Sequence, residues 1–188
     1  GSSDGHNSSG AFEEDNYFGK FGSLDGDPKS RLIGDDKRFL RAKYMSAAGL
    51  AGVWAEENTR EAIYEALERK ETFATSGPRI KVRFFGGWEY DDSSFSNDDW
   101  IKNAYQKGVS MGSDLTKTSK NESPSFLVWA VKDAEGANLD RIQVVKGWVD
   151  ADGKTHEKIF DIVWSDNREL DAAGNLPAVG NSVNEKEA

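Results

Sequence analysis

Residues 50–75 read LAGVWAEENTREAIYEALERKETFAT and carry the clearest secondary-structure signals of the chain. The short apolar run at 50–55 predicts a buried strand. Asn58 is a candidate N-cap for the helix that follows, because Glu61, three residues on, can bond back to the cap amide. The run at 72–75 is β-prone. Apolar residues at helical spacing lie between them: Ala62, Ile63, Ala66 and Leu67. The segment therefore predicts strand, helix, strand.

Downstream of residue 79 the apolar residues alternate as in a half-buried strand. Ile80, Val82 and Phe84 fall on one face, which we expect to be the buried one, and the opposite face carries charged side chains. Gly86-Gly87 is expected to end this strand. The charged residues are Arg79, Lys81 and Arg83.

Further elements follow in the same part of the chain. Residues 98–107 predict a short helix, with a cap within 96–98, and 125–132 predict another strand. Two more strands are expected at 142–149 and 158–164, joined through Asp150-Ala151-Asp152-Gly153-Lys154. Asp-Gly between β-prone runs is a strong hairpin signal. We therefore predict an antiparallel β-rich domain.

Composition limits the function classes. The 188 residues include 24 Lys and Arg against 33 Asp and Glu, which gives a formal net charge of −9. This charge argues against a nucleic acid or an anionic membrane surface as partner, because both would repel the chain. No run approaches the roughly 18 apolar residues of a membrane span. The absence of cysteine excludes disulfides, thiolate metal sites and cysteine nucleophiles.

The first ten residues hold the strongest chemical candidate. Asp4 and His6 are separated by Gly5, and residues i and i+2 of an extended segment point the same way. A carboxylate oxygen and an imidazole nitrogen can then reach one metal ion. The alternative is a polar turn in which Asp4 caps the next element. His156, the other histidine, follows the predicted hairpin turn and is expected to face solvent.

Three weaker candidates each have a structural alternative. Asp150 to Gly153 resembles the start of a calcium loop, but Asp161 stands where the closing Glu is needed, so a hairpin turn explains it better. Glu56-Glu57 can place a carboxylate at a strand end or simply favour a helix N-terminus. Aromatic residues beyond the first β strand can bind a ring or a sugar, or can build the core of the β domain: Phe84, Phe85, Trp88 and Tyr90.

These residues resemble a known family. Ser3-Asp4-Gly5-His6-Asn7 resembles the late Ser-Asp-x-His metal-binding motif of the PHP superfamily, the polymerase and histidinol phosphatase hydrolases. Four longer blocks look similar to a large uncharacterised bacterial family, a domain of unknown function within that superfamily. These blocks are residues 48–67, 72–79, 124–130 and 138–148.

The resemblance implies an α/β plus β architecture. Residues 1–78 are expected to be the C-terminal part of a distorted PHP-type β/α barrel with metal ions at the C-terminal ends of its strands. Residues 79–188 are expected to be an antiparallel β-rich accessory domain. Asp4 and His6 match two ligand positions for divalent metal ions such as zinc, manganese or iron. The remaining ligands, including an early His-x-His pair, belong to a preceding part of the same protein, so we expect this chain to be an inactive fragment on its own.

The leading functional hypothesis is therefore a metal-dependent hydrolase that uses metal-activated water on a small-molecule ester, with a phosphoester as the expected substrate. One alternative keeps the hydrolase and changes the scissile bond to a carbamate, sulfate ester or lactone. Another is a non-catalytic β-rich binding module that recognises a carbohydrate or a protein partner. Relatives with export signals suggest a periplasmic or secreted location.

Overall fold

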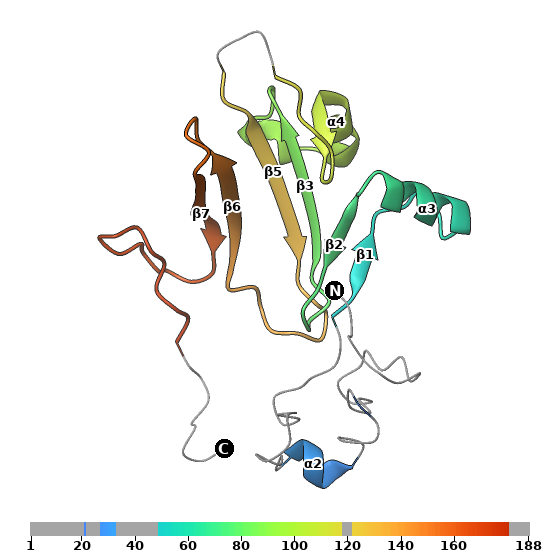
Figure 1. Ribbon diagram of the computed structural model, residues 1–188, viewed down its shortest axis with the longest axis vertical. Coiled ribbons are helices and arrows are strands. Elements are labelled where there is room, and N and C mark those ends of the chain that lie inside the picture. Colours follow the sequence, from blue (N-terminus) through green and yellow to red (C-terminus); the bar gives the residue numbers. More distant parts are fainter. Residues whose placement is uncertain (1–20, 22–26, 33–48, 118–121, 181–188) are drawn as a thin grey trace. The chain divides into compact units, whose positions relative to one another are not determined.

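The structure is a computed structural model that describes residues 21, 27–32, 49–117 and 122–180 (Figure 1). The chain divides into two compact units, residues 1–136 and residues 137–188. The first helix within the described residues is α2 (Pro28–Leu32), where Ser30 N donates to Asp27 Oδ1 at 3.0 Å. No helix in the described ranges is long and apolar enough to cross a membrane.

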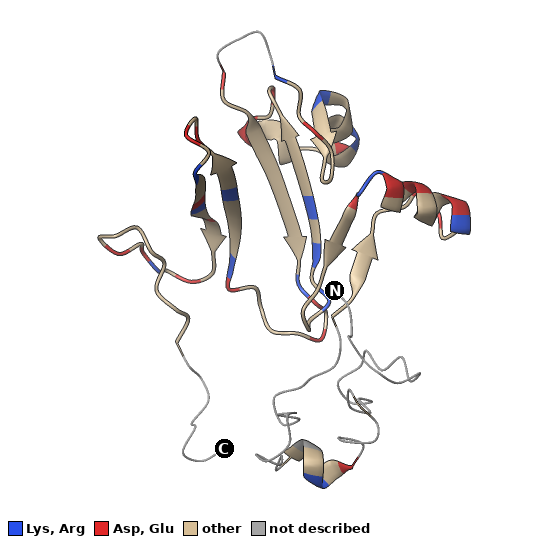
Figure 2. Cartoon of the chain, viewed as in Figure 1, with Lys and Arg blue, Asp and Glu red and all other residues tan. Residues whose placement is uncertain are grey.

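The predicted strand, helix and strand are confirmed as β1 (Ala51–Val53), α3 (Arg60–Glu68) and β2 (Thr72–Ala74). The predicted cap at Asn58 is wrong by one residue. Thr59 is the N-cap, because its backbone is extended and its hydroxyl accepts a hydrogen bond from Ala62 N at 3.3 Å. Charged residues dominate α3 in Figure 2, and within the helix only Ala66 is buried.

The two strands pair antiparallel, with Ala51 opposite Ala74. A β/α barrel is built instead from parallel strands joined by crossover helices. In the described part of the chain every strand pair is antiparallel and no barrel forms. The fold there is mixed and strand-rich, with few helices and small antiparallel sheets, as expected for its β part.

A three-stranded antiparallel sheet forms the centre of the first unit, in the order β4-β3-β5. Its strands are β3 (Lys81–Gly87), β4 (Gly108–Ser110) and β5 (Ser125–Val131). The connection from β3 to β4 holds a short 3₁₀ helix, η3 (Asp92–Phe95), and then α4 (Trp100–Lys107). The predicted helix and the predicted 125–132 strand are confirmed. The predicted cap is not, since Asp99 precedes α4 without a side-chain cap bond.

The buried face of β3 is the opposite of the predicted one. Phe85 is 1 % exposed and lies on the face that also carries Lys81 and Arg83, because alternate strand residues share a face. Its ring packs edge-on against Trp100 of α4, with centroids 6.3 Å apart. Phe84, on the predicted inner face, only stacks on the half-exposed ring of Phe126. The core is therefore built on the α4 side: Phe85, Tyr90, Ala104 and Leu127.

β3 ends at Gly87, as predicted, and the two glycines are its last two residues. They also allow a close approach of neighbouring groups. A Cβ on Gly87 would lie 2.7 Å from the Tyr90 ring, and a Cβ on Gly108, its partner in β4, would lie 2.3 Å from Gly86 O. The Tyr90 hydroxyl uses this space to donate to Ala104 O at 2.6 Å. The cross-strand pair Gly87 and Gly108 thus leaves room for the Tyr90 ring between the sheet and α4.

The second unit contains the predicted hairpin, formed by β6 (Arg141–Val149) and β7 (Thr155–Trp164). Gly153 has a φ of +79°, and its amide donates to Asp150 O at 3.1 Å. Asp150 N donates to Lys154 O at 2.9 Å, which closes the turn. A bulge between Ile142 and Gln143 shifts the register near the start of β6. The turn chemistry read from Asp-Gly is confirmed.

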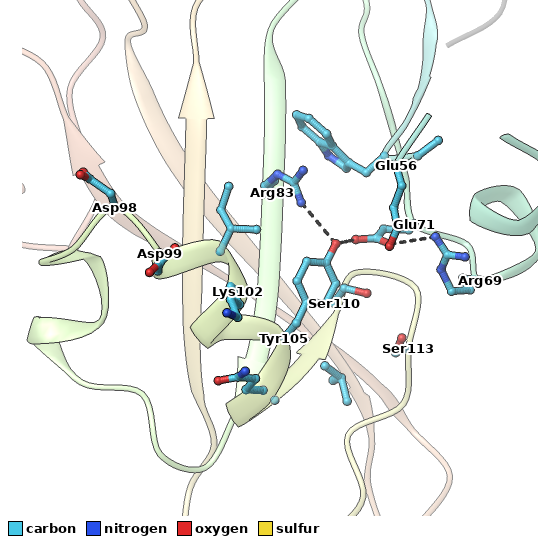
Figure 3. A pocket seen from close by; sticks show the side chains of 16 residues that line it. Glu56, Arg69, Glu71, Arg83, Asp98, Asp99, Lys102, Tyr105, Ser110 and Ser113 are labelled. Carbon is cyan, nitrogen blue, oxygen red and sulfur yellow. Dashed lines mark hydrogen bonds and ion pairs between the residues drawn. The ribbon is translucent and has the colours of Figure 1, made fainter. Parts of the chain in front are cut away.

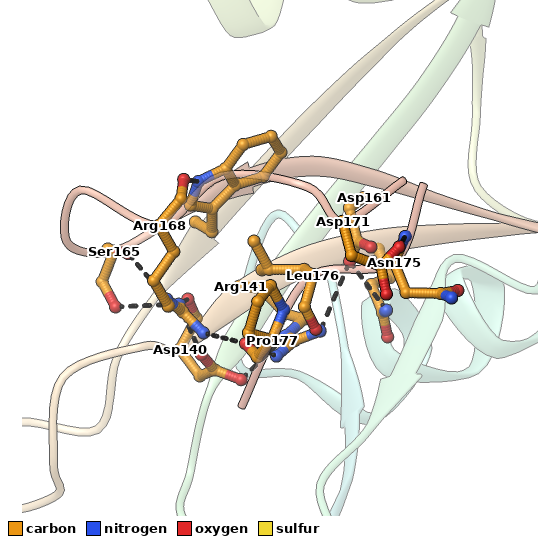
Figure 4. A network of polar contacts seen from close by, with 11 residues as sticks. Asp140, Arg141, Asp161, Ser165, Arg168, Asp171, Asn175, Leu176 and Pro177 are labelled. Atoms are coloured by element: carbon orange, nitrogen blue, oxygen red, sulfur yellow. Dashed lines mark hydrogen bonds and ion pairs between the residues drawn. The ribbon is translucent and has the colours of Figure 1, made fainter. Parts of the chain in front are cut away.

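A polar network ties the residues after β7 back to the start of β6 (Figure 4). Asp140 lies between two guanidinium groups, 2.8 Å from Arg141 Nε and 2.6 Å from Arg168 Nη2. Arg141 Nη1 also donates to Leu176 O at 3.3 Å, and Arg168 Nη1 donates to Pro177 O at 3.0 Å. The two arginines therefore hold the segment after β7 in place by donating hydrogen bonds to its carbonyl groups. The predicted domains, 1–78 and 79–188, stay a prediction.

Acidification is expected to destabilise the hairpin turn through Asp150. Hydrogen bonds from the His156 ring and from the Lys154 and Asp152 amides hold the pKa of the Asp150 carboxyl below its ordinary value. A lowered folded-state pKa stabilises the fold above the unfolded pKa of about 3.9, and this stabilisation is lost as pH falls through the folded value. We expect Asp150→Asn to reduce the loss of unfolding free energy between pH 7 and pH 2 in urea titrations.

Asp152→Asn is the control for this prediction. Its carboxylate makes no hydrogen bond with the described residues, so the pH dependence should match that of the parent chain. An Asp150 carboxyl that titrates at or above the ordinary value, measured by ¹³C NMR, would contradict the assignment.

Candidate functional site

An open cleft of about 940 Å³ lies in the first unit and is lined by α4, by β4 and by the residues next to β1 and β2 (Figure 3). Polar side chains from several elements face it. They are Glu56, Arg69, Glu71, Arg83, Asp98, Asp99, Lys102, Tyr105, Gln106, Ser110 and Ser113.

Glu71 is the centre of the cleft and is only 3 % exposed. It directly follows Lys70, whose φ of 59° turns the chain out of α3. The Glu71 amide donates to Ala66 O at 3.0 Å, and its carbonyl accepts from Trp54 N at 3.0 Å. The backbone on both sides of this residue is thus fixed, and the carboxylate is held inside the unit. A buried carboxylate needs partners, because its desolvation is costly.

Two side chains supply these partners, and a third holds one of them. The Tyr105 hydroxyl of α4 donates to Glu71 Oε1, and Arg69 Nη2 lies 3.7 Å from Glu71 Oε2. Arg83 Nη1 of β3 donates to the Tyr105 oxygen at 3.3 Å. Burial, together with the hydrogen bond to Glu71, raises the pKa of Tyr105 above its ordinary value. The phenol therefore stays protonated at neutral pH, and its proton is directed to Glu71.

Arg83 is also fixed by an aromatic ring. Its guanidinium carbon lies 3.7 Å from the centroid of Trp54, a cation–π contact that holds it over the ring. The Trp54 indole is oriented in turn by donating to Val82 O at 2.9 Å. A guanidinium has five N–H donors, and with the described residues Arg83 makes one side-chain hydrogen bond. The remaining N–H groups of Arg83 can donate hydrogen bonds to an anionic group of a ligand.

The cleft carries both signs of charge. Lys102 makes no ion pair or hydrogen bond with the described residues, and Asp98 and Asp99 lie on the same side of the cleft (Figure 3). Lysine and arginine can bind phosphate or carboxylate, and the aspartates can accept hydrogen bonds from hydroxyl groups. The arrangement suits a polar ligand that combines an anionic group with hydroxyl groups.

Glu71→Gln is expected to destabilise the chain by about 1–3 kcal/mol. The substitution keeps the shape of the side chain and removes the charge that Arg69 and Tyr105 share. The free energy of unfolding in urea measures the loss. Glu56→Gln, an exposed acid on the rim of the same cleft, is the matched control and should stay within about 0.5 kcal/mol of the parent. Equal effects for both substitutions would contradict a central role for Glu71.

The candidates from the sequence are not brought together in the described structure. Asp4 and His6 lie outside the described residues. In the described ranges no group of three His, Cys, Asp or Glu side chains could hold a metal ion. His156 is part-exposed, as expected, and its Nε2 lies 2.6 Å from Asp150 Oδ2. Glu56 lines the cleft, whereas Phe85 and Tyr90 are core residues.

Comparison with protein families places the chain. A family model described as "Protein of unknown function (DUF3604)" matches residues 1–188. The chain belongs to the DUF3604 family. No curated protein and no solved structure matches it. The expected membership of a family of unknown function is thereby confirmed, and the place of DUF3604 in the PHP superfamily stays a prediction.

Sequence reasoning missed the cleft of this DUF3604 chain. Glu71 and Tyr105 are 34 residues apart, so no local spacing connects them. One weak signal was present. Glu71 and Phe73 lie on the same face of a β-prone run that follows a helix, because Thr72 between them points the other way. If Phe73 faces inward, Glu71 does too, and a buried carboxylate needs a partner. Nothing in the sequence indicated that α4 would supply it.

Proposed function

We propose that the full-length DUF3604 protein is a metal-dependent hydrolase of phosphoesters. The observation that carries the proposal is the Ser3-Asp4-Gly5-His6 spacing, which resembles the Ser-Asp-x-His motif of PHP hydrolases. In this proposal DUF3604 is a PHP-related family, and a preceding part of the protein supplies most of the barrel and the other metal ligands. This chain supplies Asp4 and His6.

The two residues fit divalent zinc, manganese or iron by their chemistry, because these ions accept carboxylate oxygen and imidazole nitrogen together. A bound ion would supply Lewis acidity and would lower the pKa of its bound water towards neutrality. Asp4 contributes negative charge to the ligand set. His6 contributes a neutral ring nitrogen, and its other ring N–H needs an acceptor that fixes the orientation of the ring.

The cleft supports an anionic substrate independently of the motif. Arg83 has donors that the described residues do not use, and Lys102 has no described partner. Both groups favour a phosphate over a neutral ester. The proposal therefore ranks a phosphoester above a lactone, and it ranks a carbamate or a sulfate ester as the alternative scissile bond.

Metal analysis of the full-length protein tests the proposal. We expect stoichiometric transition metal after dialysis, hydrolysis of aryl phosphate mono- or diesters, loss of turnover with a chelator, and recovery when the metal is returned. Hydrolysis of a carbamate, a sulfate ester or a lactone, without phosphoesterase activity, would support a metal-dependent hydrolase that cleaves a different bond. A protein that holds no metal and hydrolyses none of these substrates would refute it.

The surface of the second unit favours a second candidate function, a non-catalytic module that binds a carbohydrate or a protein. Trp148 and Phe160 are 40 % and 37 % exposed on the β6–β7 hairpin. Exposed aromatic rings of this kind are typical of binding surfaces. Binding of glycans by metal-free protein tests this function.

A periplasmic or secreted location is part of the proposed function, and fractionation of the native cells tests it.

A further inference from the structure

One face of the β6–β7 hairpin combines aromatic rings with lysines. Three successive cross-strand pairs share this face, since alternate residues of a strand point the same way. The Trp148 and His156 rings are stacked, with centroids 5.2 Å apart and planes at 17°. The three pairs are Val144 with Phe160, Lys146 with Lys158, and Trp148 with His156. We call these six residues the lysine face.

The central pair of the lysine face is two like charges. Lys146 and Lys158 stand directly opposite each other, an arrangement that destabilises a sheet. Within the described part of the chain neither ammonium group has a carboxylate at ion-pair distance. Lys146 Nζ lies 5.1 Å from the Trp148 ring centroid, and Lys158 Nζ lies 4.8 Å from that of Phe160. The two ammonium groups thus turn apart, each towards a ring.

Carboxylates of the hairpin do not neutralise this pair. Asp150 is engaged by His156 and by the amides of the turn. Glu157 and Asp161 belong to the opposite face, where they are paired with Gly147 and Gln143. Gln143 Nε2 donates to Asp161 Oδ1 at 2.8 Å on that face. Figure 2 shows basic residues on both strands of the hairpin. The lysine face therefore has a positive charge that the hairpin leaves uncompensated.

We propose that the lysine face binds an acidic carbohydrate. Successive pairs on a face are two residues apart, roughly 7 Å along the strand. A sugar ring packs against the exposed part of Trp148, the carboxylate of a neighbouring uronate lies between Lys146 and Lys158, and a further ring contacts Phe160. An anion between the lysines removes their repulsion and forms charge-assisted hydrogen bonds with both. The inference deepens the second proposed function and rests on it, and it does not depend on the metal centre.

Charge favours a carbohydrate over a nucleic acid. The chain carries a net charge of −9, which repels a polymer with a phosphate at every nucleotide. An oligosaccharide that alternates acidic and neutral sugars has a lower charge density. Its neutral rings also offer apolar faces to Trp148 and Phe160, whereas an acidic peptide without aromatic or cyclic residues does not.

Binding of a defined oligosaccharide to the whole chain, in the presence of a chelator, tests the inference. The probe is an oligosaccharide of alternating glucuronate and N-acetylglucosamine, and the neutral control is an oligomer of N-acetylglucosamine. We expect the acidic probe to bind at least about tenfold more tightly, and Lys146→Gln with Lys158→Gln to remove that advantage, as the loss of two charge-assisted hydrogen bonds predicts. Trp148→Ala should weaken both probes. Lys154→Gln, in the turn outside the lysine face, should leave binding unchanged.

The double lysine variant should also be at least as stable in urea as the parent chain, because the like-charge pair is gone. A purely structural pair would instead lose stability, and that result would overturn the inference. Failure of the parent chain to bind either probe would overturn the inference, and the second proposed function would then be limited to the binding of a protein partner or of another glycan. If the double lysine variant bound the acidic probe as tightly as the parent chain, the role of the lysine face would be overturned, and the second proposed function would stand. Equal binding of a single-stranded DNA oligomer, or of a poly-glutamate peptide, would identify a different class of partner.

Discussion

Phe85→Ala is expected to lower the free energy of unfolding of the first unit by about 3–5 kcal/mol. The ring is almost wholly buried and packs edge-on against both Trp100 and Tyr105 of α4. Its removal leaves a cavity between the central sheet and the helix, which neither can close because both are fixed by backbone hydrogen bonds. Urea denaturation followed by tryptophan fluorescence measures the loss, since Trp100 lies beside the cavity.

Phe126→Ala is the matched control, on the neighbouring strand of the same sheet. Phe126 is 51 % exposed and stacks on Phe84 with centroids 5.4 Å apart. Its removal should cost about 1 kcal/mol or less. The difference between the two variants measures which face of β3 is covered. Similar losses for both would mean that α4 does not cover the Phe85 face.

Asp4→Asn combined with His6→Ala is expected to abolish the proposed metal-dependent turnover of the full-length protein. Loss of a residue that only hydrogen-bonds to a metal ligand typically weakens metal binding about 10–100-fold, so loss of two ligands should exceed that. Metal content after dialysis and turnover of an aryl phosphate are measured on the same preparation. Both should fall together, with the free energy of unfolding of the β-rich part unchanged.

Asp152→Asn serves as the control for the carboxylate substitution, because Asp152 is an exposed acid of the β6–β7 turn. It should keep the metal content and turnover of the parent. Full retention of both in the Asp4, His6 double variant would refute the proposed ligand roles. Loss of turnover with full metal content would show that these residues act on the substrate rather than on the metal ion.

The cleft and the lysine face offer two different kinds of recognition within one DUF3604 chain. In the cleft, Arg83 is held by Trp54 and by the Tyr105 hydroxyl, so a ligand meets a guanidinium that is already oriented. On the lysine face, two ammonium groups remain apart until an anion draws them together. The first arrangement lowers the entropic cost of binding, and the second relieves a repulsion.

The sequence alone determined the local elements of this protein. The strand, helix and strand at residues 50–75 and the hairpin around Asp150 to Lys154 were predicted correctly, because their signals depend on residues that are neighbours in the chain. Propensity also located α4 and β5. The N-cap at Thr59 was missed by one residue, since Asn58 and Thr59 are both good caps and only the backbone conformation chooses between them.

The tertiary structure alone decided which faces are covered and which side chains meet. Alternation along β3 shows that Phe85 shares a face with Lys81 and Arg83, but only the position of α4 makes that face the core. Glu71 and Tyr105 meet across 34 residues because the antiparallel sheet and α4 bring their elements together. Local spacing cannot encode such a contact, since it depends on how separate elements pack and on which buried carboxylate then needs a donor.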